Sequence, residues 1–255
     1  MGKVSATVVD SNNMQRILVL NAKGGCGKST IATNLAAYYA SQGRVTALLD
    51  YDPQGSSMRW LSLRDLERPA IHGIAAFQKR RDVTRAFQMR LPMEAERVII
   101  DAPAGITGLQ LADYVRRVDT ILIPVLPSPI DIHAAAHFIQ DLLLVGKARA
   151  QGVRLAVVAN RVRENTRIFK DLERFLSSLK LPLVATLRDS QNHIRAAEQG
   201  LGIHELEGNR LKPDHERWAP LTAWLETVAQ QTVPRSSGAV SALGLVPSGS
   251  NYPGS

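Results

Sequence analysis

One segment near the start of the chain constrains its fold more than any other. Residues 17–30 read Ile-Leu-Val-Leu-Asn-Ala-Lys-Gly-Gly-Cys-Gly-Lys-Ser-Thr: a short apolar run, a glycine-rich stretch and the start of helical periodicity. Glycines allow a tight turn whose backbone N–H groups point inward, and the positive end of the following helix adds to their attraction for phosphate. This order predicts a strand, a phosphate-binding loop and a helix, with Lys28 reaching the β- and γ-phosphates and the Ser29 hydroxyl binding Mg²⁺.

The loop departs from the usual phosphate-loop motif in two places. The usual motif has a glycine five residues before Gly27, and this chain has Ala22 there. Lys23, directly before Gly24, is a cation that the usual motif lacks. A second lysine needs a second negative charge to justify it, so we expect a further anion near Lys23.

Short apolar runs alternate with longer helical segments along the rest of the chain. The apolar runs lie at residues 17–20, 45–49, 98–100, 121–125, 155–158 and 183–184. The helical segments lie at residues 29–41, 57–66, 108–117, 130–150, 166–179, 191–199 and 215–230. Such alternation is typical of βαβ units around a parallel sheet that is buried on both faces. We therefore predict an α/β fold, a single-domain P-loop NTPase with a mostly parallel central sheet flanked by helices.

Both ends of the chain differ from this core. We expect an N-terminal extension over residues 1–15, one ATPase-type domain over residues 16–232 and a tail over residues 233–255. From Pro234 onward glycine, serine and proline are frequent and bulky apolar residues are too few to build a core. The tail is therefore predicted to be flexible.

Charge and composition narrow the surroundings of the protein. The formal charge is +8 and the pI is about 9.9, which favours association with a polyanion such as nucleic acid or an anionic membrane surface. No run approaches the roughly 18 apolar residues of a membrane-spanning helix, and residues 1–13 lack the pattern of an export signal. A single cysteine, Cys26, fits a reducing compartment. These features together favour a cytoplasmic protein.

Further motifs follow the loop in a fixed order. Residues 48–56 read Leu-Leu-Asp-Tyr-Asp-Pro-Gln-Gly-Ser, residues 98–104 read Val-Ile-Ile-Asp-Ala-Pro-Ala, and residues 187–189 read Leu-Arg-Asp. With Lys23, these motifs resemble the deviant Walker A box, the switch I segment, the Walker B strand with switch II, and the base-side segment of the ParA/MinD family. The resemblance covers about residues 16 to 230 and implies an ATPase with weak intrinsic activity whose ligands are ATP and Mg²⁺.

The resemblance assigns roles to the motif residues. In the family the lysine at the place of Lys23 crosses a dimer interface to the partner's nucleotide, so Lys23, Lys28 and Asp52 are the implied catalytic residues, with Asp52 positioning the attacking water. Ser29, Asp50 and Asp101 would serve the Mg²⁺ ion and its water shell. The implied ATP-binding residues are Lys23, Gly24, Gly25, Cys26, Gly27, Lys28, Ser29, Thr30 and Asn160, the last of which would recognise adenine.

Some of these positions have a plainer alternative. Asp50 and Asp52 could close a turn with Pro53, and Asn160 could serve a turn after a strand, because Asp, Asn and Pro are common turn residues. Leu187 stands where relatives often have proline, so the contacts on the base side are less constrained by the resemblance.

The resemblance also implies partners. It predicts a homodimer with ATP sandwiched between the subunits, a cargo adaptor protein that stimulates hydrolysis, and nonspecific binding to the DNA of the nucleoid. A MinD-like basic amphipathic helix is missing from the tail, where Arg235 is the one charged residue, so a membrane partner is not expected. Candidate DNA contacts are Arg161, Arg163, Arg167, Lys170, Arg174, Arg188 and Arg195, with a second basic cluster at residues 79–81.

Several functions within this resemblance stay open. The cargo could be a plasmid, a chromosome or a protein body such as a carboxysome, and the residues do not name it. A MinD-like membrane-associated positioning ATPase and a small-molecule synthetase of the same superfamily are the alternatives. For any single arginine among the DNA candidates, a solvated helical face explains the charge equally well.

Overall fold

The computed structural model describes residues 14–78, 90–163, 166–208 and 211–229, and within them one sheet of seven parallel strands. The strand order is β3-β2-β4-β1-β5-β6-β7. The strands are β1 (Gln15–Val19), β2 (Thr46–Asp50), β3 (Ile71–Ala75), β4 (Arg97–Asp101), β5 (Thr120–Val125), β6 (Arg154–Val162) and β7 (Leu183–Arg188). The prediction of a single α/β domain around a mostly parallel sheet is confirmed, since every strand pair is parallel.

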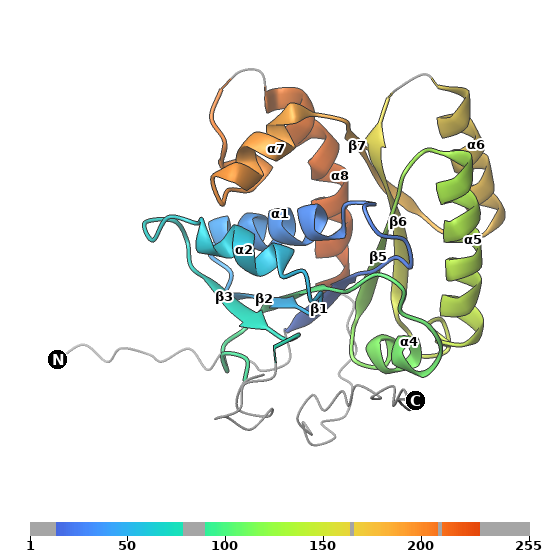
Figure 1. The fold of residues 1–255 in the computed structure, drawn as a ribbon, viewed down its shortest axis with the longest axis horizontal. Coiled ribbons are helices and arrows are strands. Elements are labelled where there is room, and N and C mark those ends of the chain that lie inside the picture. The colour runs from blue at the N-terminus through green and yellow to red at the C-terminus, as the bar shows by residue number, and fades with distance from the viewer. Residues whose placement is uncertain (1–13, 79–89, 164–165, 209–210, 230–255) are drawn as a thin grey trace, which may run out of the picture.

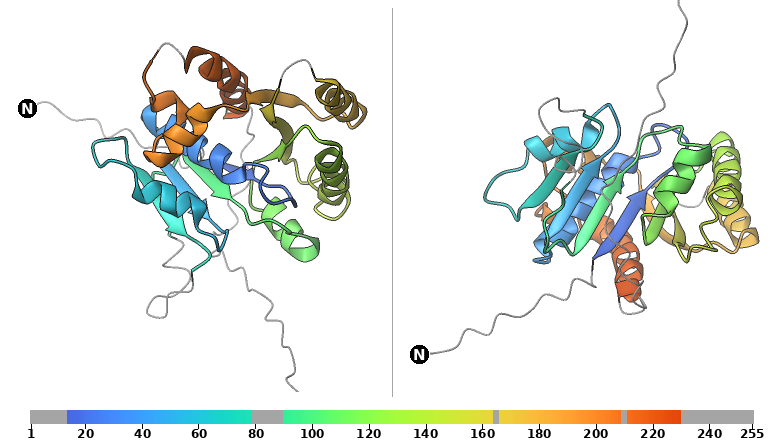
Figure 2. Two further views of the ribbon diagram at one scale, coloured as in Figure 1. Left: turned by 45° about the horizontal axis from the view of Figure 1, so that its top comes forward. Right: turned by 90° about the horizontal axis from the view of Figure 1, so that it is seen from below.

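Helices cover both faces of the sheet (Figure 1). They are α1 (Lys28–Ser41), α2 (Ser56–Ser62), α4 (Gly108–Val115), α5 (Pro129–Leu144), α6 (Arg167–Ser178), α7 (Gln191–Glu198) and α8 (Lys212–Ala229), with a 3-10 turn η1 (Ile203–Glu205). Helices α1, α2, α7 and α8 lie on one side, and α4, α5 and α6 lie on the other. Figure 2 shows the same separation from two further directions, with the green and yellow helices apart from the blue and orange ones.

The central strands are apolar because they are buried on both faces. Every residue of β2, β4 and β5 is buried. Alternate strand residues feed two cores, one that includes Leu111 of α4 and Phe138 of α5, and one that includes Leu35 of α1 and Trp218 of α8. The two cores fix the sheet from both sides and so hold the loops at its carboxyl edge in place.

The structure adds one strand that the sequence analysis did not predict. Strand β3 lies at the edge of the sheet, and its His72 and Gly73 are exposed, which removes the apolar pattern of a central strand. A Cβ atom on Gly73 would lie 2.3 Å from the Leu61 Cδ2 atom, so the glycine lets α2 approach the strand closely.

Two helices end four or more residues earlier than predicted. Helix α2 ends at Ser62 rather than residue 66, because the Leu63 and Arg64 N–H groups donate to carbonyls three residues back and tighten the chain into a turn. Helix α5 ends at Leu144 rather than residue 150, because Lys147 has a φ of 50° that leaves the helical region.

Some predicted features lie outside the described residues. These are residues 1–13 of the predicted extension, the basic cluster at residues 79–81 and the predicted tail at residues 233–255. Among the helices that the structure describes, none is both long enough and apolar enough to cross a membrane.

Candidate nucleotide-binding site

The glycine-rich loop connects β1 to α1 at the centre of the sheet, and its backbone has the shape that the sequence predicts. Gly25 and Gly27 have φ values of 73° and 92°, in the left-handed region that favours glycine. A Cβ atom on Gly27 would lie 2.1 Å from the Asn160 Nδ2 atom, whereas one on Gly24 or Gly25 would meet nothing within 4 Å. The open space over Gly24 and Gly25 is where a phosphate can approach the backbone.

Hydrogen bonds within the loop hold its two lysines in different surroundings. Lys28 is buried, and its Nζ atom donates to the Lys23 carbonyl oxygen at 3.1 Å. The Cys26 thiol donates to the same oxygen at 3.3 Å, and burial raises the pKa of that thiol. Asn21 accepts from the Lys23 N–H at 3.1 Å and donates to the Pro124 carbonyl at 2.7 Å. Asn21, which the sequence analysis did not single out, therefore fastens the loop to β5.

Lys23 reaches an acid on α5. Its Nζ atom lies 2.5 Å from the Asp131 Oδ1 atom, and the Lys23 side chain remains 38% exposed while Asp131 is buried. The Ser128 hydroxyl donates to the other Asp131 oxygen, and the Asp131 N–H donates back to the Ser128 Oγ atom at 3.2 Å. In the single chain Lys23 is thus paired with Asp131, an acid that the sequence analysis did not identify.

Asp101 ends β4 next to the loop and has one buried oxygen without a partner. Its Oδ2 atom accepts from the Ser57 hydroxyl at 2.7 Å, while Oδ1 is buried and makes no hydrogen bond within the described part of the chain. Burial raises the pKa of Asp101 to about 6, and the nearby Ser29 and Ser57 hydroxyls oppose that rise. A buried carboxylate oxygen close to the Ser29 hydroxyl is an oxygen donor set that suits Mg²⁺.

Asp50 is the neighbour of Asp101 in the parallel register of β2 and β4, and both its oxygens are engaged. Its Oδ1 atom accepts from the Asp52 N–H at 3.0 Å, and Oδ2 accepts from the Ser57 and Met58 N–H groups at 3.0 and 3.1 Å. Burial raises the pKa of Asp50, and these three backbone bonds oppose that rise. Asp50 therefore fixes the loop between β2 and α2.

Asp52 projects from that same loop. Its side chain is partly exposed, and its Oδ1 atom accepts from the Gln54 N–H at 2.9 Å. This is the Asp-Pro turn that the sequence analysis weighed as an alternative. The turn does not exclude a role for Asp52 in chemistry, because it holds the carboxylate at the sheet edge that carries the phosphate loop.

Asn160 packs directly onto the phosphate loop. It is buried, and its Nδ2 atom donates to the Cys26 carbonyl oxygen at 2.9 Å. Arg161 follows with a φ of 52° at an irregularity in the pairing of β6 with β7, and its N–H donates to the Asn160 Oδ1 atom at 3.0 Å. A bulge with one residue in the left-handed region re-aims the neighbouring side chain, which here turns Asn160 toward the loop.

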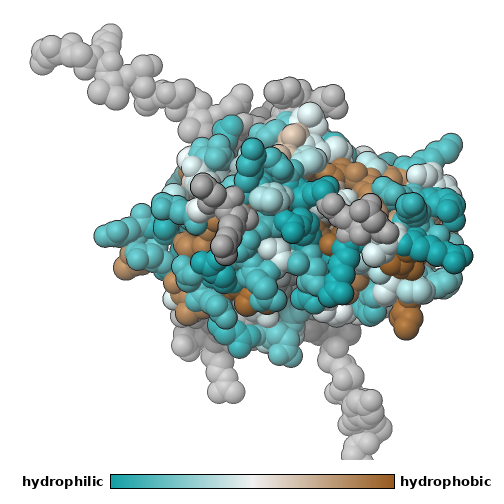
Figure 3. Space-filling model, turned by 90° about the horizontal axis from the view of Figure 1, so that it is seen from above, coloured by the Kyte–Doolittle hydropathy of each residue, from teal (hydrophilic) through white to brown (hydrophobic). Residues whose placement is uncertain are grey.

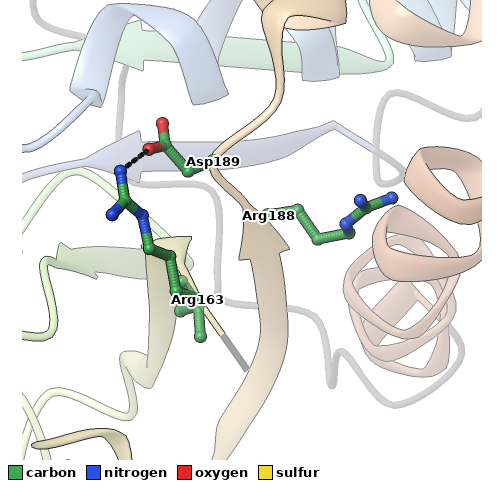
Figure 4. Close-up of a pocket in the computed structure, with 4 residues that line it drawn as sticks. Arg163, Arg188 and Asp189 are labelled. Carbon is green, nitrogen blue, oxygen red and sulfur yellow. Dashed lines mark ion pairs between the residues drawn. The ribbon is translucent and has the colours of Figure 1, made fainter. Parts of the chain in front are cut away.

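A cavity of about 230 Å³ opens at the ends of β6 and β7, lined by Val162, Arg163, Arg188 and Asp189. Figure 4 shows Arg163 directed toward Asp189, with 3.6 Å between the Arg163 Nη2 and Asp189 Oδ2 atoms, and Arg188 turned away toward α8. Arg188 lies 4.0 Å from the buried Asp214. Arg188 and Asp189 of the predicted base-side segment are therefore two of the four residues that line this cavity.

The seven basic residues considered for DNA contact are all exposed. Arg161 and Arg163 end β6 or follow it, Arg188 ends β7, and the others lie on two helices, namely Arg167, Lys170 and Arg174 on α6 and Arg195 on α7. Arg163, Arg174 and Arg188 pair with acids of the same chain. One face of the molecule, drawn in Figure 3, is mostly hydrophilic with separate hydrophobic patches.

Comparison with known proteins agrees with this geometry. Residues 17–203 match the CobQ/CobB/MinD/ParA nucleotide binding domain, a stretch that runs from β1 to η1. Maintenance of carboxysome distribution protein A from Halothiobacillus neapolitanus is 29% identical over 197 residues, which cover 77% of this chain and 89% of that protein.

Solved structures share the fold at lower identity. A complex of Cyanothece McdA with ATP has a TM-score of 0.62 and 17% identity, covering 83% of this chain and 97% of the other. A putative plasmid partition protein from Borrelia burgdorferi, bound to AMPPNP, has a TM-score of 0.63 and 16% identity, covering 84% of this chain and 99% of the other. At these identities the two structures establish the fold alone.

Proposed function

Because the chain belongs to the CobQ/CobB/MinD/ParA family of nucleotide-binding domains, we propose that it is an ATP-driven positioning switch. With ATP it forms a homodimer that binds DNA without reading the sequence, and hydrolysis of ATP releases both. The observation that supports this proposal is the pair of lysines at either end of the glycine-rich stretch, with Lys28 buried and bonded to the loop backbone and Lys23 partly exposed. One lysine suffices to hold a nucleotide, so the second serves another contact.

The loop and the acids around it have separate roles in binding and hydrolysing ATP. The backbone of residues 24–30 surrounds the phosphates, and Lys28 exchanges its bond to the Lys23 carbonyl for phosphate oxygens. Ser29 and Asp101 hold Mg²⁺, which when bound neutralises charge on the phosphate oxygens. Asp52 orients the attacking water, and Asp50 keeps the loop that carries Asp52 in shape through its three backbone bonds.

The adenine base lies on the Asn160 side of the loop. Asn160 already contacts the Cys26 carbonyl, and the cavity lined by Arg163 and Arg188 lies at the end of β6, the strand that carries Asn160. Amide groups can donate to and accept from a base edge at once, which is why Asn suits this place.

Dimerisation depends on ATP because Lys23 contacts the nucleotide of a second subunit. To make that contact, Lys23 gives up its pairing with Asp131. The γ-phosphate is the charge that ATP has and ADP lacks, so ATP favours the dimer more than ADP does. The pairing with Asp131 keeps Lys23 at the surface of the single chain, where the side chain is 38% exposed and accessible to a partner.

DNA binding would use the exposed basic side chains of β6, α6, β7 and α7. Arginine and lysine bind phosphates without reading bases, and a dimer doubles their number. This accounts for the link between ATP and DNA, because a single chain with the charges of one subunit binds a polyanion more weakly than two chains do. The net charge of +8 favours the same outcome.

The cargo is proposed by analogy with relatives. The relative from Halothiobacillus neapolitanus is named for maintaining carboxysome distribution, and the Borrelia burgdorferi relative for plasmid partition. We propose that an adaptor on a cargo of one of these two kinds binds the DNA-bound dimer and stimulates hydrolysis. The protein then works in the cytoplasm on the nucleoid.

Binding to a labelled duplex of random sequence tests the proposal. Fluorescence anisotropy is measured with ATP and with ADP over a series of salt concentrations, in the Asp52→Ala variant to prevent turnover. We expect binding with ATP alone and a steep loss of affinity as salt rises, because phosphate contacts release counterions. Equal binding with ADP, or a flat response to salt, would contradict the proposal.

A double variant with a matched control locates the surface. Arg167→Ala with Lys170→Ala removes two exposed charges from α6 of each subunit and should lower the salt slope of the dimer by up to about four. Arg68→Ala removes an exposed charge from the loop after α2 and should leave the slope within the error of the parent. A slope unchanged in the double variant would remove α6 from the interface.

A further inference from the structure

Ser57 is a fully buried residue in the first turn of α2 that bonds to the candidate magnesium carboxylate. Its hydroxyl donates to the Asp101 Oδ2 atom at 2.7 Å, and the exposed fraction of Ser57 is 0%. The other oxygen of Asp101, Oδ1, is buried and has no hydrogen-bond partner in the described residues. The carboxylate therefore has one oxygen fixed by protein and one oxygen left for a ligand.

The backbone of Ser57 touches the second buried acid of the site. Its N–H donates to the Asp50 Oδ2 atom at 3.0 Å, and Asp50 and Asp101 are partners in the register of β2 and β4. Two neighbouring buried carboxylates repel one another when both are charged. Ser57 gives each of them a donor, from the backbone to Asp50 and from the side chain to Asp101.

The far end of α2 and the turn that follows it are also bonded to another part of the chain. The Trp60 Nε1 atom donates to the Leu201 carbonyl at 3.2 Å. The Arg64 guanidinium lies 2.6 Å from Glu205, with both side chains only 4% exposed. These bonds tie α2 to the segment after α7 and so set the position of the Ser57 hydroxyl.

We propose that Ser57 is a positioning residue that holds the Asp101 Oδ2 atom so that Oδ1 faces the cation accompanying the nucleotide. The inference rests on the proposed function, because it takes Asp101 as the carboxylate on the Mg²⁺ side. Ser57 acts through Asp101 and touches neither ATP nor metal. Without its hydroxyl the carboxylate can rotate, and the loss falls on the binding of Mg²⁺ more than on the binding of the base or phosphates.

The test compares Ser57→Ala with Ser56→Ala, whose side chain is partly exposed one residue earlier, and with Asp101→Asn. The probe is a fluorescent ATP analogue, and the quantity is the Mg²⁺ concentration at half-maximal binding, with the affinity at saturating Mg²⁺ measured separately. For Ser57→Ala we expect the Mg²⁺ requirement to rise about threefold to tenfold, which is the usual size of one lost hydrogen bond. The affinity at saturating Mg²⁺ should change less than about twofold, and Ser56→Ala should match the parent.

Failure of this inference is distinct from failure of the proposed function. In one outcome, binding of the analogue by the parent depends on Mg²⁺, Asp101→Asn impairs the binding of Mg²⁺, and Ser57→Ala matches the parent. The role of Ser57 is then wrong and the proposed function stands. A lower melting temperature for Ser57→Ala in EDTA with an unchanged Mg²⁺ requirement would also overturn the role of Ser57, because it indicates a structural role alone. If the parent binds the analogue equally well without Mg²⁺, both the inference and the proposed metal site are wrong.

Discussion

Lys23 and Asp131 form an ion pair within one chain, with 2.5 Å between the Nζ and Oδ1 atoms. The lysine proposed to act on the nucleotide of a second subunit is therefore held by an acid of its own subunit. Asp131 is itself fixed by the Ser128 hydroxyl and lies buried at the start of α5. This pairing competes with the proposed dimer contact of Lys23, so we expect Asp131 to influence how much ATP is needed to form the dimer.

Replacing Asp131 by asparagine keeps the shape of the side chain and removes its charge. We expect the ATP concentration at half-maximal dimerisation to fall about twofold to tenfold, because a competing ion pair of modest strength has been removed. Analytical ultracentrifugation over a series of ATP concentrations measures this half-maximal concentration. Asp141→Asn, an exposed acid on the same helix, is the control and should behave as the parent. A rise in the ATP requirement would mean that Asp131 assists the dimer instead.

Gly27 should tolerate no side chain. Alanine there would place a methyl group 2.1 Å from the Asn160 Nδ2 atom, on a backbone whose φ of 92° disfavours any L residue. The free energy of unfolding should fall by about 2–4 kcal/mol, as crowding and backbone strain add. Gly24→Ala, with nothing within 4 Å, should change it by less than about 0.5 kcal/mol. Urea denaturation of the nucleotide-free protein measures both changes. An equal loss of unfolding free energy in the two variants would contradict the geometry.

His204 should make stability depend on pH. It packs against His215, with ring centroids 5.6 Å apart, and against Trp218, and burial lowers the pKa of His204 to about 4. The unfolded chain, with a histidine pKa near 6.5, then binds more protons than the folded chain between about pH 4 and 6.5. The free energy of unfolding therefore falls as pH drops through this window, by up to roughly 3 kcal/mol from this group.

The measurement for His204 compares urea denaturation of His204→Phe with that of the parent at several pH values. The variant should lose less stability than the parent between pH 6.5 and 4.5, whereas His72→Gln, at an exposed position, should follow the parent. The raised pKa of Asp101 acts in the opposite sense, so the difference between variant and parent isolates His204. Parallel curves for variant and parent would show that His204 does not titrate as described.

Asp52 should be needed for hydrolysis and not for assembly. Asp52→Ala removes the carboxylate proposed to orient the water, and the rate of phosphate release should fall by about a hundredfold or more. The ATP dimer should persist because nothing in it depends on that oxygen. Asp65→Asn, an exposed acid beyond the other end of α2, should keep the parent rate. Hydrolysis at the parent rate in Asp52→Ala would show that another residue orients the attacking water.

The sequence predicted those parts of the fold that have a strong local pattern. The loop from Lys23 to Thr30 and the apolar run ending at Asp101 could be located because glycine spacing and continuous burial leave a mark in the sequence itself. Strand β3 left no such mark, because an edge strand with an exposed His72 and Gly73 has no apolar pattern.

The partners of the site residues could not be predicted in the same way. Asp131 meets Lys23, and Ser57 meets Asp101, only because separate strands and helices end at one edge of the sheet. An acid or a serine in the first turn of a helix looks like an ordinary residue of a helix N-terminus in the sequence. Their contacts arise from the topology, and so they became visible only with the fold.

The most direct test of the account is the mass of the Asp52→Ala protein in light scattering, with and without the further change Lys23→Ala. With ATP and Mg²⁺ the Asp52→Ala protein should have the mass of two 27.9 kDa chains, and with ADP the mass of one. The double variant Asp52→Ala with Lys23→Ala should bind a fluorescent ATP analogue and still have the mass of one chain with ATP and Mg²⁺. An ATP-dependent dimer of unchanged mass and affinity without Lys23 would contradict the central claim.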